Sequence, residues 1–263
     1  MEFKKWEEVL APYNNAVEEL KVKFKNIRKE FLTKGEYSPI EFVTGRTKKI
    51  SSIMAKSQRL SIENAEEDME DIAGIRIMCQ FVEDIQTIVE CIRQRNDMTI
   101  VAEKDYIENF KDSGYRSYHV IIKYPINSIK GSREILCEIQ IRTLAMNFWA
   151  TIEHSLKYKY EHFIPENIAT RLRRAADAAF ILDQEMSEIR EDIMRAQVMC
   201  QIKAVTTREI SDKINKLHSL GEIEISRFYK NKLSEFDEDE DDELKLIKLR
   251  NEVDNVLKQY KNN

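Results

Sequence analysis

The stretch that most constrains the fold spans residues 137–150. Its first half alternates strictly, with apolar side chains on one face and Glu138, Gln140 and Arg142 on the other. A period of two predicts a half-buried strand. Residues 144–160 then carry apolar groups at helical spacing, so the strand leads directly into a helix. The polar face has two interpretations, a solvated sheet surface or a site that holds a metal ion or accepts a proton.

Composition describes a charge-rich globular chain. The 263 residues are 42% hydrophobic and 34% charged, which is enough to bury a sizeable core. No apolar run approaches the roughly 18 residues that a membrane span needs, and the N-terminus does not resemble a secretory signal. The four cysteines are widely spaced, which argues against zinc and a disulfide framework and favours reduced thiols. We therefore expect a cytoplasmic protein without a membrane partner.

Charge and glycine are both unevenly distributed. The net charge is −5, yet residues 237–243 are seven consecutive acids, so the rest of the chain is slightly positive. A basic body suits anionic ligands, and the acidic run is interpreted as a solvated linker or an electrostatic brake. Five of the six glycines precede residue 160. Since glycines mark turns, we expect a mixed α/β body there and mostly helix beyond it.

Hydrophobic periodicity supplies the remaining elements. Strand patterns or short apolar runs occupy 73–81, 98–101 and 119–125, with Pro125 expected to end the last of these, and residues 132–135 lead into the strand of Glu138. Helical patterns occupy 15–31, 47–59, 82–95, a long segment after Pro165, 207–220, 222–233 and 249–260. The segment after Pro165 is more apolar than a lone surface helix needs, which suggests a subunit contact.

Two basic clusters have competing interpretations. If 47–59 is helical, Lys48, Ser52, Lys56 and Arg59 share one face, and Arg46 lies just ahead of it. Such a group could hold a polyphosphate, although ordinary surface lysines give the same pattern. A second stripe on the helix at 15–31 is either a solvated face or an anion site beside a subunit contact. Its members are Lys21, Lys25 and Arg28.

Charged and aromatic residues also mark two other segments. Arg76 lies within the apolar strand at 73–81 and must be paired or face a cleft. Asp71, at the entrance of that strand, is either a turn residue or a metal ligand. Around Gly114, basic, aromatic and imidazole groups alternate, which permits base stacking and phosphate binding but is equally compatible with a polar hairpin loop.

Common motifs of nucleotide and hydrolytic enzymes are absent from the sequence. It contains no G-x-x-x-x-G-K-[ST], G-x-G-x-x-G, H-E-x-x-H or G-x-S-x-G, and the four histidines show no metal-ligand spacing. If the protein is an enzyme that acts on nucleotides, it does not bind them through a P-loop.

Four separated motifs together resemble a known family. In order and spacing, 42–46, 71–76, 113–119 and 138–143 resemble the synthetase domain of the RelA/SpoT-type alarmone synthetases. The lack of a hydrolase domain and the segment 145–154 point to the small stand-alone class. The resemblance covers about residues 1 to 200 and stops near Ala204.

The resemblance implies an α+β fold, with a mixed, mostly antiparallel central sheet of the nucleotidyltransferase-like synthetase type, flanked by helices and followed by a helical C-terminal part. We expect residues 1–160 to form the catalytic body with its N-terminal helices. Residues 161–204 are expected to form a helical oligomerisation segment, and 205–263 a helical tail that contains the acidic run.

The implied activity is transfer of pyrophosphate from ATP to the 3′-hydroxyl of GDP or GTP with release of AMP, which makes (p)ppGpp in the stringent response. Asp71 and Glu138 would hold Mg²⁺, and Glu138 would also accept the hydroxyl proton. The implied ATP contacts are Arg46, Lys48, Ser52, Lys56, Arg59 and Arg76, with the guanidinium groups of Arg46 and Arg76 on either side of adenine. The implied GDP/GTP contacts are Lys111, Tyr115, which would stack on guanine, His119, Gln140 and Asn147.

The resemblance also implies a homotetramer in which (p)ppGpp, the product, binds between subunits as an allosteric ligand. The implied regulatory residues are Lys21, Lys25, Arg28, Phe42 and Thr44.

Two other functions remain open on the sequence. A nucleotidyltransferase acting on another acceptor commonly needs two acids one residue apart on a strand, but position 140 is Gln. A non-catalytic module that senses RNA or a nucleotide would use the basic faces for binding alone, and salt-sensitive RNA binding without product would identify it.

Overall fold

The structure is a computed structural model that describes residues 2–60, 68–129, 131–159, 165–236 and 243–261. Within these ranges, no helix combines the length and the apolar character that crossing a bilayer requires. Residues 1–188 and 189–263 form two compact units, and α6 (Glu166–Ser219) contributes residues to both. The predicted division at 160 and 204 stays a prediction.

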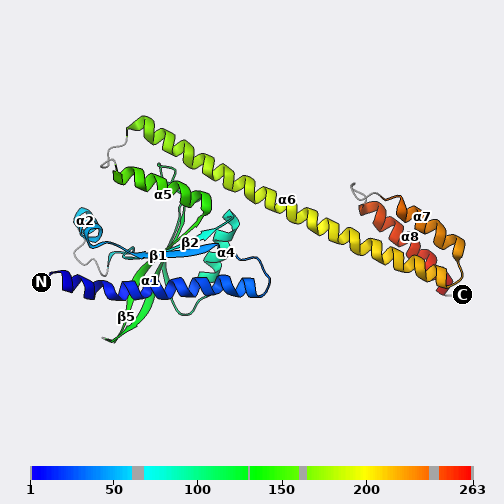
Figure 1. The fold of residues 1–263 in the computed structure, drawn as a ribbon, viewed down its shortest axis with the longest axis horizontal. Coiled ribbons are helices and arrows are strands. Elements are labelled where there is room, and N and C mark those ends of the chain that lie inside the picture. Colours follow the sequence, from blue (N-terminus) through cyan, green and yellow to red (C-terminus); the bar gives the residue numbers. More distant parts are fainter. Residues whose placement is uncertain (1, 61–67, 130, 160–164, 237–242, 262–263) are drawn as a thin grey trace. The chain divides into compact units, whose positions relative to one another are not determined.

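A five-stranded sheet organises the first unit (Figure 1). Its order is β1-β2-β5-β4-β3, and only β2 and β5 run parallel. The sheet is therefore mixed and mostly antiparallel, which confirms the predicted fold class. The strands are β1 (Phe42–Thr47), β2 (Ala73–Cys79), β3 (Thr99–Asp105), β4 (Tyr118–Ser128) and β5 (Gly131–Thr143).

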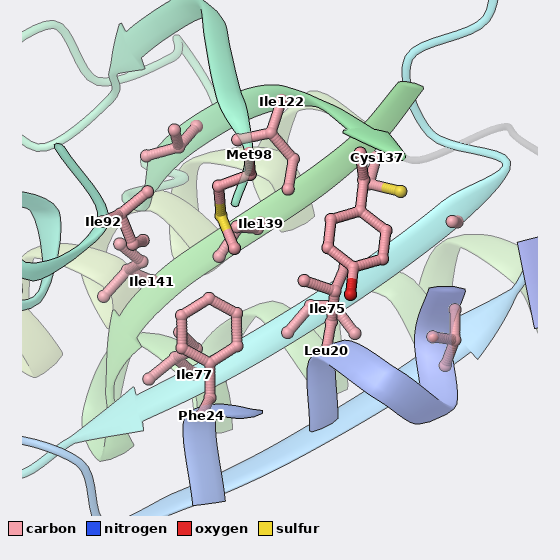
Figure 2. Packing of buried hydrophobic residues seen from close by; sticks show 14 of the residues in the cluster. Leu20, Phe24, Ile75, Ile77, Ile92, Met98, Ile122, Cys137, Ile139 and Ile141 are labelled. Atoms are coloured by element: carbon pink, nitrogen blue, oxygen red, sulfur yellow. The ribbon is translucent and has the colours of Figure 1, made fainter. Parts of the chain in front are cut away.

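One face of the sheet is the hydrophobic core. Alternate residues of β2 and β5 point to this face, and Ile75 and Ile139 are 0% exposed. Two amphipathic helices, α1 (Glu2–Thr33) and α4 (Val82–Arg93), contribute residues to the same core. In Figure 2, Leu20 and Phe24 of α1 point toward the isoleucines of β2 and β5. This packing supplies most of the stability expected of the sheet.

Helix α1 is longer than its predicted range of 15–31, even though Pro12 lies inside it. A proline within a helix removes one hydrogen bond and clashes with the preceding turn. Burial offsets this cost, because Tyr13 is 1% exposed and Trp6 and Leu10 pack against the core. Tertiary packing therefore extends the helix beyond the range that local propensity indicates.

The prediction that Pro125 ends its strand is wrong, because β4 continues to Ser128. β3 pairs with β4 only as far as Lys123, so beyond that point β5 is the one strand among the described residues that pairs with β4. A residue without an N–H is tolerated where one edge of a strand is unpaired. Pro125 lies opposite Glu134 in this two-stranded extension.

The remaining helices of the first unit follow β5. Helix α5 (Leu144–Lys159) starts directly at the end of β5, and the first part of α6 packs against α5 through Trp149, Ala150 and Ala176. Helix α2 (Ile50–Leu60) lies between β1 and β2 in the sequence.

In the second unit, α6 runs unbroken past residue 207, where a separate helix was predicted. The predicted break at Gly221 is confirmed, since α7 (Ile223–Ser234) begins beyond it and Gly221 has a φ of 90°. Helix α8 (Glu243–Lys261) covers the predicted 249–260. The acidic residues 237–242 lie outside the described ranges. Buried side chains from α6 and α8, Leu217, Leu246 and Val253 among them, form a separate core.

Candidate active site

The second face of the sheet carries the predicted site. In the ladder between β2 and β5, Gly74 lies opposite Glu138, and Arg76 lies opposite Gln140. His119 of β4 also pairs with Gln140 in the antiparallel ladder. Residues opposite each other in a sheet point to the same face, so the register alone gathers these polar side chains on the face away from the core.

Glu138 is the best-held carboxylate on this face. Its Oε1 lies 2.9 Å from Nδ1 of His119, and its Oε2 accepts a hydrogen bond of 2.7 Å from the Gln140 amide. Burial disfavours the ionised form, but these hydrogen bonds outweigh it, so the pKa of Glu138 lies below its ordinary value. The carboxylate is therefore ionised at neutral pH and can accept a proton.

Asp71 lies in the turn before β2 and contacts two ammonium groups. Its two oxygens accept from Lys48 at 2.5 Å and from Lys56 at 2.9 Å. Burial opposes its ionisation, but these contacts lower the pKa of Asp71 overall. Its charge also counteracts the lowering of the Glu138 pKa, so the two carboxylates lie within electrostatic range of each other.

The pair fits a divalent hard cation. Two ionised carboxylates within electrostatic range of each other supply the oxygen ligands that Mg²⁺ prefers, and Mg²⁺ commonly takes most of its other ligands from water and phosphate. Among the described residues, no group of three His, Cys, Asp or Glu side chains offers an all-protein metal site.

The predicted ATP residues gather around Asp71 only in part. Helix α2 begins at Ile50, so Lys48 lies ahead of it and not on its face as predicted. Lys48 and Lys56 nevertheless meet at Asp71. Ser52 and Arg59 are exposed on α2, at the three- and four-residue spacings that place them on the same side as Lys56.

Arg46 and Arg76 lie on adjacent strands. Thr44 pairs with Arg76 and Arg46 with Gly74, so both guanidinium groups are on the site face. Burial and the nearby charges of Arg142 and Arg46 lower the pKa of Arg76. Arg76 also donates to Oε1 of Gln140 at 3.3 Å. The cation predicted to face a cleft is therefore on the same face as Glu138.

The loop at 111–117 brings an aromatic group to the site. Tyr115 places its hydroxyl 2.8 Å from Nε2 of His119, and Lys111 places its ammonium 5.1 Å from the Tyr115 ring centroid. Tyr115 therefore contacts His119, and Lys111 contacts Tyr115; all three were predicted to contact the acceptor nucleotide. Asn147 is half-buried on α5, and among the described residues its side chain makes no hydrogen bond to this group.

The same loop is anchored on α6. Arg116 donates to Asp177 at 3.0 Å, and its guanidinium lies 4.4 Å and 4.5 Å from the ring centroids of Phe110 and Phe180. Gly114 has a φ of 87°, and a Cβ there would come within 2.5 Å of the Ala176 side chain. The first part of α6 therefore determines the position of the Tyr115 loop.

The predicted regulatory residues divide between the two faces. Lys21 and Arg28 are on α1, where Arg28 donates to the carbonyl of Ile40 at 3.0 Å. Phe42 and Thr44 are exposed on β1 and point to the opposite face from Val43, which is in the core. Lys25 is exposed on α1. One chain therefore does not gather all five residues into a single pocket.

The sequence analysis did not predict two residues that contact the predicted site residues, Tyr106 and Arg142. Tyr106 makes edge-to-face contacts with both Tyr115 and His119, at centroid distances of 6.1 and 5.1 Å. Arg142, only 4% exposed, donates to the hydroxyl of Tyr115 at 2.6 Å. A signal for Arg142 existed, because it shares the polar face of its strand with Glu138. For Tyr106, nothing in the local pattern indicated a role.

Comparisons with known proteins support the resemblance found in the sequence. Residues 45–162 match the pattern described as "Region found in RelA / SpoT proteins". The chain is 57% identical over 198 residues to the GTP pyrophosphokinase YjbM of Bacillus subtilis, which covers 75% of this chain and 94% of that protein. The crystal structure of the small alarmone synthetase 1 from Bacillus subtilis bound to its product pppGpp matches with a TM-score of 0.70 at 57% identity, over 72% of this chain and 98% of that one.

A structure of the same Bacillus subtilis synthetase bound to AMPCPP matches with a TM-score of 0.65 at 53% identity, over 73% of this chain and 99% of that one. These matches cover nearly the whole length of the relatives and about three quarters of this chain. The chain belongs to the small alarmone synthetases of the RelA/SpoT family.

Proposed function

We propose that this chain is a GTP pyrophosphokinase that transfers pyrophosphate from ATP to the 3′-hydroxyl of GDP or GTP and releases AMP. The observation that carries the proposal is the pair of ionised carboxylates, Asp71 and Glu138, which lie within electrostatic range of each other. Asp71 contacts the predicted Lys48 and Lys56, and Glu138 shares its face of the sheet with the predicted arginines. The sequence of a GTP pyrophosphokinase, 57% identical, aligns over the same region.

The reaction forms one bond and breaks one. The 3′-oxygen of the acceptor attacks the β-phosphorus of ATP, and the bond from that phosphorus to the oxygen bridging the α-phosphate breaks, so the electron pair leaves with AMP. The hydroxyl proton goes to Glu138, which is ionised and has a free lone pair on each oxygen. Phosphoryl chemistry otherwise needs mainly positioning and charge neutralisation.

We assign the nucleotide contacts from the chemistry of each side chain and from its position in the candidate site. Arg46 and Arg76 offer two guanidinium planes for adenine, since arginine stacks on aromatic faces. On the acceptor side, we assign guanine to the Tyr115 ring, with neighbouring contacts to the same nucleotide from Lys111, His119, Gln140 and Asn147. The ATP phosphates are assigned to Lys48, Ser52, Lys56 and Arg59.

Asp71 and Glu138 would hold Mg²⁺. When bound, the ion neutralises charge on the transferring phosphates. Lys48 and Lys56 already contact Asp71, so the metal ligand and the phosphate-binding ammonium groups are neighbours.

We extend the proposal to the assembly of the protein and its regulation by (p)ppGpp. A homotetramer with (p)ppGpp bound between subunits would explain why Phe42 and Thr44 point away from the α1 stripe of Lys21, Lys25 and Arg28. The stripe of one copy could then meet the β1 edge of another. We also propose a cytoplasmic location, where ATP and GTP are available.

A product assay tests the activity. The full chain is incubated with ATP, Mg²⁺ and either GDP or GTP, and products are separated by anion-exchange chromatography. We expect AMP to form in a 1:1 ratio with guanosine tetra- or pentaphosphate. Formation of ADP, or of free pyrophosphate without the guanosine product, would contradict the proposal and indicate a kinase or a nucleotidyltransferase.

A further inference from the structure

Two neighbouring residues of the loop at 111–117 have separate sets of partners. The hydroxyl of Tyr115 lies 2.8 Å from Nε2 of His119 in the candidate active site. Arg116, the next residue, donates instead to Asp177 of α6 at 3.0 Å. Arg116 is only 7% exposed, so its guanidinium is buried at the attachment of the loop to α6. One residue of the pair therefore reaches the site, and the other fastens the loop.

The Arg116 guanidinium also contacts the loop itself. Nη1 donates to the carbonyl of Gly114 at 3.2 Å, and the group lies 4.4 Å from the ring centroid of Phe110, directly ahead of the loop. On the side of α6, the ring centroid of Phe180 lies 4.5 Å away. A guanidinium is attracted to aromatic faces and donates in a fixed planar geometry, so one group can hold several partners in place.

Backbone hydrogen bonds close the loop into a turn. The N–H of Gly114 donates to the carbonyl of Lys111 at 2.7 Å, and the N–H of Lys111 donates to the carbonyl of Tyr115 at 3.3 Å. Within the described residues, these bonds join the turn to itself, and Arg116 supplies its hydrogen bond to α6. Lys111 and Tyr115 are both predicted to contact the acceptor, so the attachment of the turn determines where these two contacts lie.

Stability alone would not favour an arginine at position 116. Its Nε is buried and has no hydrogen-bond partner among the described residues, which carries a desolvation cost. The side chain of Asp177 is 46% exposed, so water screens the ion pair on one side. Replacing a buried ionic group with an apolar one of similar volume is often neutral or stabilising. The contacts of Arg116 therefore point to a role in holding the loop in one geometry.

We propose that Arg116 is a positioning residue for the acceptor nucleotide, because it holds the loop of Lys111 and Tyr115 on α6. A loop that is already held in its bound conformation loses less conformational freedom when a ligand binds, and this improves affinity. The inference rests on the proposed function, since it assumes that guanine stacks on Tyr115. Guanine is common to GDP and GTP, so both acceptors depend on Arg116 equally.

The test compares Arg116→Met with the wild type as full-length proteins in the product assay, with each nucleotide varied in turn. Methionine keeps an apolar side chain near the two phenylalanine rings but lacks the charge and the donors. We expect the KM for GDP and for GTP to rise by similar factors of about tenfold. The Tyr115 hydroxyl keeps its contacts with His119 and Arg142, which limits the effect.

Other kinetic and structural readouts separate positioning from folding. For Arg116→Met, the KM for ATP and kcat at saturating substrates should stay within about threefold of the wild type, because Arg116 contacts no reacting group. The urea midpoint should not fall, since an apolar residue replaces a buried cation. In the nucleotide-free protein, hydrogen exchange at the amides of Lys111 and Gly114 should be faster in the variant.

Further variants test the contact with Asp177. Asp177→Asn weakens the charge-assisted hydrogen bond and should raise the KM for GDP in the same direction by less. Arg116→Lys keeps the charge but has one donor group, so it should recover part of the affinity. Arg116→Met combined with Asp177→Asn should behave as Arg116→Met alone, because both changes remove one contact. Arg174→Met, at an exposed position of α6, is the control and should match the wild type.

Each outcome supports or overturns the inference. An unchanged KM for GDP and GTP in Arg116→Met would overturn it, and so would an equal rise in the KM for ATP or a lower urea midpoint, which indicate a structural role. A rise for GTP alone would assign Arg116 to the phosphates and overturn it as well. If Arg116→Met fails to fold, the KM values of Asp177→Asn decide.

Failure of the proposed function would be recognised separately. A wild type that forms no guanosine product would refute that function. GDP binding measured by calorimetry on the wild type and on Arg116→Met would then decide the inference, with about tenfold weaker binding expected in the variant.

Discussion

The two faces of strand β5 differ in what they contribute. Cys137, Ile139 and Ile141 are all 0% exposed and lie in an apolar core, where burial stabilises the fold roughly in proportion to area. Glu138, the residue between the first two, points to the other face and is held by hydrogen bonds alone. Such a polar network adds little net stability and is costly if one member is left unpaired. Residues that stabilise the core and the residue proposed to take part in the reaction are therefore direct neighbours in the sequence, on opposite faces of β5.

The largest effect should come from Glu138→Gln. Gln is close in shape, so folding should be intact, but it cannot take the proton, and turnover should fall by at least about 10²–10³. AMP formation at saturating ATP and GDP measures this. Glu134→Gln, on the same strand and the same face but exposed, is the control and should keep wild-type turnover. Near-normal turnover of the Glu138 variant would remove that residue from its role.

The neighbouring position tests the core face. Ile139→Ala should lower the free energy of unfolding by about 2–5 kcal/mol, because it deletes methyl and methylene groups at a fully buried site. Urea unfolding followed by circular dichroism measures the change. At a temperature where this variant is folded, kcat should stay within about threefold, in contrast to Glu138→Gln. Val101→Ala, at a position that is 52% exposed, should change stability by less than about 0.5 kcal/mol.

A buried carboxylate of α6, Asp183, accepts a hydrogen bond from Thr143 at the end of β5 and gives a pH-dependent test. Burial raises the pKa of Asp183 to about 6, and nearby Glu83 adds to this against the hydrogen bond from Thr143. A folded-state pKa above the unfolded one stabilises the fold fully at low pH, and that contribution is lost as the pH rises through about 6. Asp183→Asn should remove this dependence and stabilise the protein at pH 7 by up to about 3 kcal/mol.

Urea titrations of the wild type and of Asp183→Asn at pH 4.5 and pH 7 would decide this. If the wild type loses no more stability than the variant between these two pH values, Asp183 does not titrate in this range.

The smallest effect on activity is expected from the second unit. Leu246→Ala removes a side chain that is 1% exposed in the separate core of α6 and α8. Hydrogen exchange in α8 should accelerate, while turnover stays within about twofold, because no predicted site residue lies beyond Asn147. Leu244→Ala, at a position that is 74% exposed, is the control. A tenfold loss of turnover in Leu246→Ala would show that catalysis depends on the C-terminal helices.

Much of the secondary structure could be predicted from the local hydrophobic pattern of the sequence. The alternation at 137–142 predicted a strand with a polar face, and the long apolar periodicity after Pro165 predicted helix, because one side chain in two or in 3.6 must face a core. The family resemblance named Asp71 and Glu138, and the register between β2 and β5 is consistent with their meeting.

Only the tertiary structure decided which residues complete the site and where elements end. Helix α1 extends past Pro12 and β4 past Pro125 because packing and an unpaired strand edge override local preference. The hydrogen bonds of Tyr115 to His119 and to Arg142 join the loop at 111–117 to β4 and β5, and a hydrogen bond needs its two atoms within about 3 Å in the right orientation. Sequence spacing determines which face a side chain is on; across strands and loops, only the folded chain determines which atoms it reaches.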